Sequence, residues 1–136
     1  MTTDEYLAID GNTLIDDPDE TLLRQVHPLQ MDGDEPTTAA FLPSQNHNFL
    51  LSTKRERVGP REACEAHQQI PLETAGTWGV RVSDAADAST PAIDDAAHTG
   101  QVDHASLSFL DLPTPGRRRQ SARKLRDAAR CLYRVP

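Results

Sequence analysis

Apolar and polar residues alternate along several short stretches of this chain, which is typical of β-strands that bury one face. In the clearest case, Trp78, Val80 and Val82 point to the same side of an extended segment. Another stretch, "FLLST", is a compact apolar run bounded by loop residues. Together the patterns predict strands at residues 21–27, 37–42, 49–53, 77–83 and 104–112.

Two segments carry apolar residues three and four positions apart, which is the spacing of one helical face. The first, residues 59–69, places Ala63, Ala66 and Ile70 on such a face, and Pro60 suits its first turn. The second is predicted to be a longer C-terminal helix. It covers residues 114–134, with Thr114 as N-cap and an apolar stripe of Ala122, Leu125, Ala129 and Leu132.

The remaining segments are predicted to be turns and loops. Two short apolar runs in residues 6–15 flank an Asp-Gly pair, which accepts the positive φ of a tight turn, so an N-terminal hairpin is expected. Residues 84–103 are polar and rich in alanine without a clear period, and a long loop with one helical turn is expected there.

This element order predicts an α+β domain: a small, mainly antiparallel sheet with two helices packed on one face. A length of 136 residues fits a single domain. Its expected parts are an acidic N-terminal hairpin or arm (1–20), a sheet core with one helix (21–113) and a basic C-terminal helix (114–136).

The composition and the apolar runs of the chain restrict what its core can contain and in which cellular compartment it is expected. Aromatic residues make up only 4% of the chain, so the core must rest on aliphatic side chains and is expected to be thin. No apolar run approaches the roughly 20 residues that span a bilayer. The acidic beginning, "MTTDEYLAID", lacks the features of a signal peptide. A cytoplasmic protein without membrane contact is therefore expected.

The net charge of −7 is distributed unevenly along the chain. Residues 1–36 carry ten carboxylates and a single arginine, whereas residues 117–136 are strongly basic. The predicted partner-binding residues of the basic segment are Arg117, Arg118, Arg119, Arg123, Lys124 and Arg126. The two segments could attract each other within the fold or between copies, or each could bind its own partner. Another protein is the expected partner; nucleic acid and a homo-oligomer remain open.

The stretch "TLLRQVHPLQ" (21–30) places polar residues on both faces of a predicted strand, because Arg24 and Gln25 point to opposite sides. An unpaired buried polar group costs about 1–3 kcal/mol, so each needs a partner. Arg24 could pair with an N-terminal carboxylate, and His27 could bond a loop carbonyl. Alternatively, Arg24 binds an anion through its planar guanidinium, with His27 beside it.

Another candidate element is the strand beginning at His104, because a histidine and a serine two positions apart share a face. His104 and Ser106 could therefore reach one phosphate, with His104 and His27 as acid and base and Ser106 as an anion ligand. Asp94 and His98 lie four apart, but the segment is a poor helix, and a solvated loop is the favoured interpretation.

Recognised catalytic and cofactor motifs do not occur in the sequence. The patterns GxSxG, GxGxxG, GxxxxGK[ST] and HExxH are missing, and neither cysteine lies in a catalytic pattern. Nucleophilic catalysis, a metal and a cofactor are therefore not predicted.

Four short pieces of the chain are similar in layout to a group of short bacterial proteins. These pieces are "RQVHP" (24–28), "AFLP" (40–43), "LS" (51–52) and the "GV-V" pattern at 79–82. The resemblance would cover most of the chain beyond residue 20. It implies a bacterial origin and assigns no activity or functional residue.

The charge distribution and the missing catalytic motifs favour a small accessory or interaction protein, such as a component of an operon-encoded assembly. The alternative is an enzyme acting on a phosphorylated or nucleotide-like substrate through Arg24, His27 and His104. A weaker alternative is an RNA-binding module that uses the basic C-terminal helix.

Overall fold

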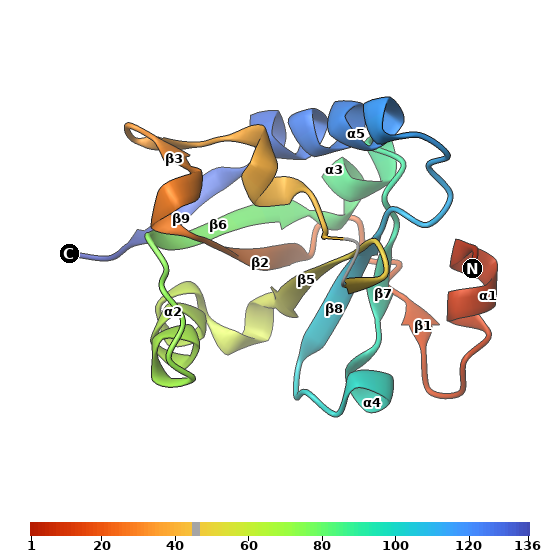
Figure 1. Ribbon diagram of the computed structural model, residues 1–136. Helices are drawn as coiled ribbons and strands as arrows, with labels where there is room; N and C mark the ends of the chain where they lie inside the picture. The colour runs from red at the N-terminus through yellow and green to blue at the C-terminus, as the bar shows by residue number, and fades with distance from the viewer. Residues whose placement is uncertain (45–46) are drawn as a thin grey trace.

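The computed structural model of the protein describes residues 1–44 and 47–136, and its central feature is an antiparallel sheet (Figure 1). Within the described residues, seven strands form this sheet in the order β1-β7-β8-β5-β2-β6-β9. In chain order they are β1 (Thr13–Leu14), β2 (Thr21–Val26), β5 (Leu50–Arg55), β6 (Gly76–Arg81), β7 (Ala92–Asp94), β8 (His104–Ser108) and β9 (Arg130–Arg134). A separate small ribbon pairs β3 (Met31–Asp32) with β4 (Glu35–Pro36).

Helices surround the sheet on both sides. The α-helices are α1 (Thr3–Leu7), α2 (Pro60–Gln69), α3 (Val82–Asp87), α4 (Ala96–Thr99) and α5 (Pro115–Ala128). Short 3-10 helices occur at η1 (Pro28–Gln30), η2 (Thr38–Phe41) and η4 (Glu56–Val58). None of the helices in the described part of the chain combines the length and apolar character that a membrane crossing requires. The predicted α+β class and mainly antiparallel sheet are confirmed.

One face of the sheet carries the apolar core. Trp78 on β6 and Leu22 on β2 are buried there with Phe41 of η2 and Leu125 of α5. α3 and α5 lie above this face in Figure 1. The core is built mainly from aliphatic residues and alanines, as the composition predicts.

α2 lies on the opposite face. Thr77 neighbours Trp78 in β6 and therefore points away from the core. Its hydroxyl donates a hydrogen bond to the carbonyl oxygen of Pro60, at the start of α2, over 2.7 Å. The predicted packing of two helices on one face is thus not confirmed, because α2 and α5 are on opposite sides of the sheet. On this face α2 contacts β2, β6 and β9, whereas α4 and α1 cover β8.

The predicted N-terminal hairpin is wrong. Residues 3–7 form α1 because Thr2 and Glu5 build a capping box, in which the Thr2 hydroxyl accepts from the Glu5 amide and the Glu5 carboxylate accepts from the Thr2 amide. β1 then pairs with β7 rather than with a neighbouring strand.

Three other segments differ from expectation. Residues 37–42 form the 3-10 helix η2 instead of a strand, and residues 84–103 contain β7 and α4 instead of a loop. The predicted helix at 114–134 begins as expected, with the Thr114 hydroxyl accepting from the Arg117 amide, but ends at Ala128. The last residues become β9 because they pair with the edge of β6, and this pairing overrides the helical spacing.

Candidate functional site

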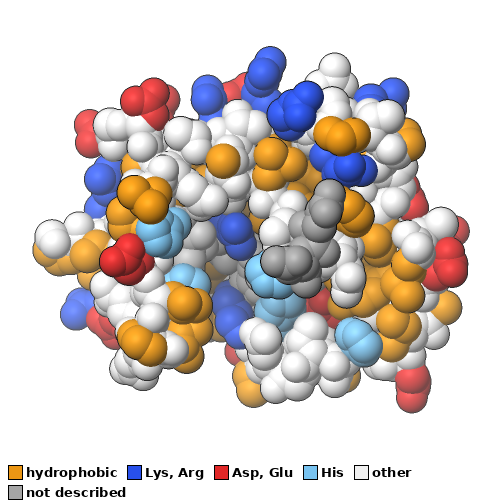
Figure 2. All heavy atoms as spheres, in the orientation of Figure 1, with side chains coloured by type: hydrophobic (Ala, Val, Ile, Leu, Met, Phe, Trp, Pro, Cys, Tyr) orange, Lys and Arg blue, Asp and Glu red, His pale blue; other side chains and the backbone are white. Residues whose placement is uncertain are grey.

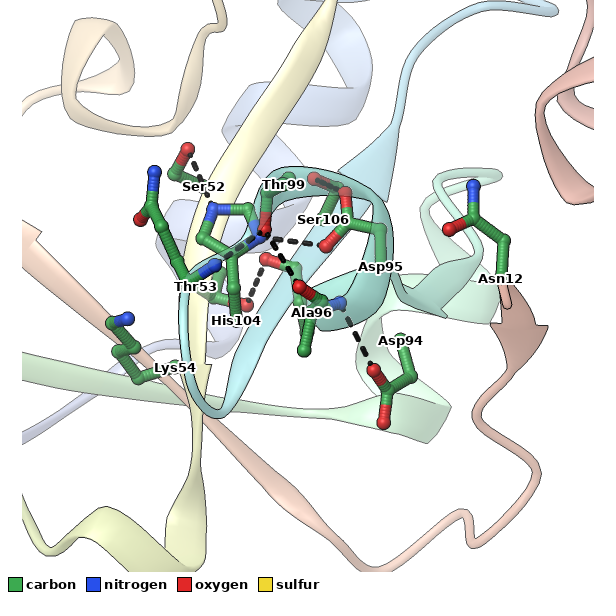
Figure 3. Close-up of polar contacts among 12 residues, drawn as sticks. Asn12, Ser52, Thr53, Lys54, Asp94, Asp95, Ala96, Thr99, His104 and Ser106 are labelled. Carbon is green, nitrogen blue, oxygen red and sulfur yellow. Dashed lines mark hydrogen bonds and ion pairs between the residues drawn. The ribbon is translucent and has the colours of Figure 1, made fainter. Parts of the chain in front are cut away.

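Polar side chains from β5 and β8 lie on the same face of the sheet as α2. In the strand register, Ser52 lies opposite Ser106 and Lys54 opposite His104. Residues directly opposite each other in an antiparallel pair share a face, so all four side chains point toward the same side. Figure 3 shows Ser52 and His104 approaching each other from these neighbouring strands.

Asp95 is the centre of the site. It follows β7 directly, and its carboxylate is fully buried. Oδ1 lies 2.6 Å from His104 Nδ1, while Oδ2 accepts hydrogen bonds from the Ser106 hydroxyl at 2.6 Å and the Tyr6 hydroxyl at 2.5 Å. Tyr6 comes from α1, so the N-terminal helix completes the surroundings of this carboxylate.

These contacts keep Asp95 ionised. Burial alone would raise the pKa of its carboxyl group, but the hydrogen bonds from His104, Ser106 and Tyr6 outweigh burial and leave the pKa below its ordinary value. Burial also raises the pKa of Tyr6, and the bond to Asp95 raises it further, so its hydroxyl stays protonated as a donor.

The charge of Asp95 fixes the tautomer of His104. A carboxylate only accepts hydrogen bonds, so His104 Nδ1 must carry the proton that lies between them. In the neutral imidazole, Nε2 then has a free lone pair, and it lies 3.2 Å from Ser52 Oγ. His104 is buried, whereas Ser52 is exposed. The bonded series Asp95–His104–Ser52 therefore ends at a hydroxyl that a ligand can reach (Figure 3).

The Ser52 side chain lines a groove of about 970 Å³. Its walls come from α2, the loop before β5 and the loop before β8, and its floor comes from β2 and β5. Figure 2 shows this face hollowed near its centre, with histidine and basic side chains around the hollow. Ala66 of α2 and Ile70 at its C-terminal cap, both predicted to face inward, are exposed and line this groove.

Arg24 lies on the floor, where β2 and β5 separate. Its Nε donates to the carbonyl oxygen of Ala40 and its Nη1 to that of Ser52, each over 3.0 Å. Within the described residues it forms no ion pair, so the predicted pairing with an N-terminal carboxylate is not observed. Arg55, rather than Arg24, pairs with an N-terminal carboxylate, that of Glu20. Burial lowers the pKa of Arg24 to about 10, which leaves it charged at neutral pH.

His27 and Ser106 do not share the groove with His104. His27 lines a smaller hollow of about 370 Å³ that also contains Arg24. There its Nδ1 accepts from the Leu29 amide, and its Nε2 lies 3.1 Å from a Glu73 carboxylate oxygen. Ser106 is buried against Asp95 and positions that carboxylate. Of the predicted site residues, Arg24 and His104 therefore line the same groove, and His104 and Ser106 bond the same carboxylate.

The basic residues predicted to bind a partner lie on α5, across the sheet from this groove. Arg118 donates to the Leu112 carbonyl and packs over the Phe49 ring, and Arg126 contacts Asp127. The exposed members without an ion pair in the described part of the chain are Arg117, Arg119, Arg123 and Lys124. The acidic N-terminal segment therefore does not neutralise them.

Ser52, Asp95 and Tyr6 were not predicted from the sequence. Ser52 lies in the middle of a strand, outside any GxSxG turn, and Asp95 was part of a segment interpreted as a solvated loop. The available signal was the polar face of β8: His104 and Ser106 need partners if that face is buried. A search for a carboxylate to satisfy them would have pointed to the acidic pair at 94–95.

A metal centre finds no support in the described residues, because no group of three or more His, Cys, Asp or Glu side chains is close enough to hold an ion. In comparisons with protein-family models, curated proteins and solved structures, the chain matches none.

Proposed function

We propose that the protein is a hydrolase that transfers an acyl group from an ester or amide to water, with Ser52 as nucleophile. His104 is the general base and Asp95 the carboxylate that orients it. The observation that carries this proposal is the hydrogen-bonded series from Asp95 through both nitrogens of His104 to Ser52. A serine, histidine and aspartate bonded in this order activate a hydroxyl in many unrelated folds.

The chemistry follows from the protonation states. His104 Nε2 removes the Ser52 hydroxyl proton as Oγ attacks the substrate carbonyl carbon, and the imidazolium is stabilised by Asp95. When the bond to the leaving group breaks, His104 returns the proton to that group. Water then attacks the acyl-serine, again through His104, and the acid product leaves with Ser52 restored.

Burial and exposure are distributed as this mechanism requires. Asp95 is shielded from water, so its interaction with His104 is strong, and Ser52 is the exposed end of the series. The Ser52–His104 distance of 3.2 Å is at the long end of hydrogen-bonding reach, which is common before substrate binds.

The test is covalent labelling with a serine-reactive fluorophosphonate, followed by peptide mass spectrometry and by hydrolysis of 4-nitrophenyl butyrate. Labelling at Ser52 is expected. Ser52→Ala and His104→Ala should each lower hydrolysis by at least about a hundredfold, the usual contribution of a general base. Because Ser52 is exposed, its replacement should not lower thermal stability, and this separates lost chemistry from lost folding.

The matched control is Ser44→Ala. Ser44 is also exposed in the groove and lies 3.1 Å from His47 Nδ1, but no carboxylate in the described residues orients that histidine. This variant should label and hydrolyse like the wild type. Labelling elsewhere than Ser52, or hydrolysis unchanged by Ser52→Ala, would contradict the proposal.

A second candidate function is binding of an acidic protein partner through α5. It is supported by the exposed cations of α5 that have no internal counter-charge, starting with Arg117 at the helix N-terminus, where a positive charge is locally unfavourable. An acidic partner would relieve that repulsion. A bacterial, cytoplasmic setting, as the sequence suggests, is part of this proposal.

The test is a triple variant that reverses charge at Arg117, Arg119 and Arg123, compared with the wild type in pull-downs and in binding to single-stranded RNA. Loss of a specific protein partner supports the proposal, and an unchanged set of partners contradicts it. Binding to RNA instead, with a steep salt dependence, would identify a nucleic-acid module.

A further inference from the structure

Arg24 has unused hydrogen-bonding capacity beside the candidate nucleophile. A guanidinium carries five N–H donors. Two of them bond the carbonyl oxygens of Ala40 and Ser52, and both partners are neutral. No carboxylate in the described residues neutralises the cation. Burying a cation without a counter-charge costs free energy, and an anion bound in the groove beside Arg24 would reduce that cost.

The strand register explains why Arg24 is held at this point. β2 pairs with β5 only at Leu22 with Arg55 and Leu23 with Lys54, and beyond those pairs the strands separate. Arg24 occupies the gap and bonds the backbone of Ser52 itself. The guanidinium is therefore held beside the candidate nucleophile, and the Arg24 side chain lines the same groove as Ser52.

Other charges around Arg24 leave room for an anion. Asp103 lines the groove but is bound by Arg57, and Glu73 in the smaller hollow contacts His27. Lys54, also in the groove, donates to the Val102 carbonyl and adds a second cation.

His67 of α2 lies close enough to Arg24 to be affected by its charge. It lines both hollows with Arg24. Burial lowers the pKa of His67, and the positive charge of Arg24 lowers it further. The positive charge of Arg24 therefore disfavours protonation of the His67 imidazole. An anion bound to Arg24 would weaken this effect.

We propose that the substrate carries a carboxylate or phosphate group, bound by the free donors of Arg24, close to the acyl carbonyl that Ser52 attacks. This inference rests on the proposed hydrolase function and specifies its substrate class. The planar guanidinium matches two oxygens of either group, and each charge-assisted bond is stronger than a neutral one.

The experiment compares three 4-nitrophenyl esters of similar size: butyrate, hemisuccinate and 3-phosphonopropionate. The wild type should show a higher kcat/KM for an anionic ester than for butyrate, by about tenfold to a hundredfold for one or two charge-assisted bonds. Preference for hemisuccinate identifies a carboxylate substrate, and preference for phosphonopropionate a phosphorylated one. Arg24→Met should remove most of the preference, and Arg24→Lys should retain part of it.

Arg61→Met is the matched control, because it removes one exposed arginine of α2 that does not line the groove. It should leave the anionic-to-neutral ratio within about twofold of the wild type, as expected for screened surface charge. A ratio near one in the wild type, or an equal loss in both variants, would overturn the anion inference.

A binding measurement covers the case in which Arg24→Met does not fold. Succinate and inorganic phosphate are titrated into the wild type and Ser52→Ala, and the ring signals of His67 are followed by NMR. Saturable shifts with either anion support the inference, and no shift with both refutes it. If Ser52→Ala hydrolyses all three esters normally, the hydrolase proposal fails instead, so the two failures are distinguishable.

Discussion

Replacing Asp95 with asparagine tests the buried network directly. The substitution keeps the shape of the side chain, removes its charge and replaces one acceptor oxygen by an NH2 group, which only donates. Tyr6 Oη and Ser106 Oγ donate to one carboxylate oxygen and His104 Nδ1 to the other, so at least one of these three donors loses its acceptor. Hydrogen bonds to a charged group contribute about 1 kcal/mol more than neutral ones. A buried donor left unpaired costs about 1–3 kcal/mol, so two weakened bonds and one lost bond give an expected loss of at least about 3 kcal/mol in the free energy of unfolding.

The loss should depend on pH in a defined direction. Because the folded state holds the pKa of Asp95 below its ordinary value of 3.8, the stabilisation is fully present above pH 3.8 and is lost as pH falls through the folded pKa. The difference between wild type and Asp95→Asn should therefore be largest near neutral pH and shrink steadily in acid.

The assay is urea unfolding at several pH values between neutral and about pH 3. With an m-value of about 2 kcal/mol/M, the midpoint at neutral pH should fall by about 1.5 M. Asp87→Asn is the control: Asp87 is exposed at the end of α3, and its replacement should change stability by less than about 0.5 kcal/mol. A loss below about 1 kcal/mol for Asp95→Asn, or a difference independent of pH, would refute the reasoning.

Two further predictions concern the sheet. Gly76 has φ +152°, and an added Cβ would lie 2.2 Å from the Tyr133 carbonyl oxygen, so Gly76→Ala should cost at least about 2 kcal/mol and increase hydrogen exchange in β9. Normal stability and protection in that variant would contradict the close approach of β6 and β9. Arg55 bonds both Glu20 and Asp94, and its side chain is 15% exposed, so Arg55→Gln should cost about 3 kcal/mol in thermal unfolding. A melting temperature equal to that of the wild type would show that the ion-pair network adds nothing.

The strands and helices that the sequence predicts well are those whose pattern and packing agree. β6 carries Trp78 and Val80 into the core as predicted, although the predicted strand ends at Arg81 and Val82 begins α3. α2 begins at Pro60, where proline suits the first turn, although its predicted inner residues Ala66 and Ile70 are exposed. α5 starts at its predicted cap, Thr114, for the same local reason. These features depend on residues close in the sequence, so a local sequence pattern can predict them.

The elements that were missed depend on distant partners. β9 continues an apolar stripe that would suit a helix, yet it pairs with β6 more than fifty residues earlier, at Gly79 and Gly76. β7 is only three residues long and pairs with β8 at one edge and β1 at the other. No local period identifies a strand this short, so Asp95 behind it was placed in a loop.

The ambiguous pattern of "TLLRQVHPLQ" follows from the use of both sheet faces. One face packs Leu22 and Val26 under η2 and α5, so alternate positions must be apolar. The other face turns Gln25 toward Thr77 and the groove, where polar groups have partners or meet solvent. Arg24 shares the face of Leu22 and Val26 and bonds Ala40 of η2 there, but it lies where β2 and β5 separate, so its guanidinium also reaches the groove. A strand that packs against the core on one face and lines a groove on the other does not alternate cleanly, and this explains why so irregular a segment lies beside the candidate nucleophile.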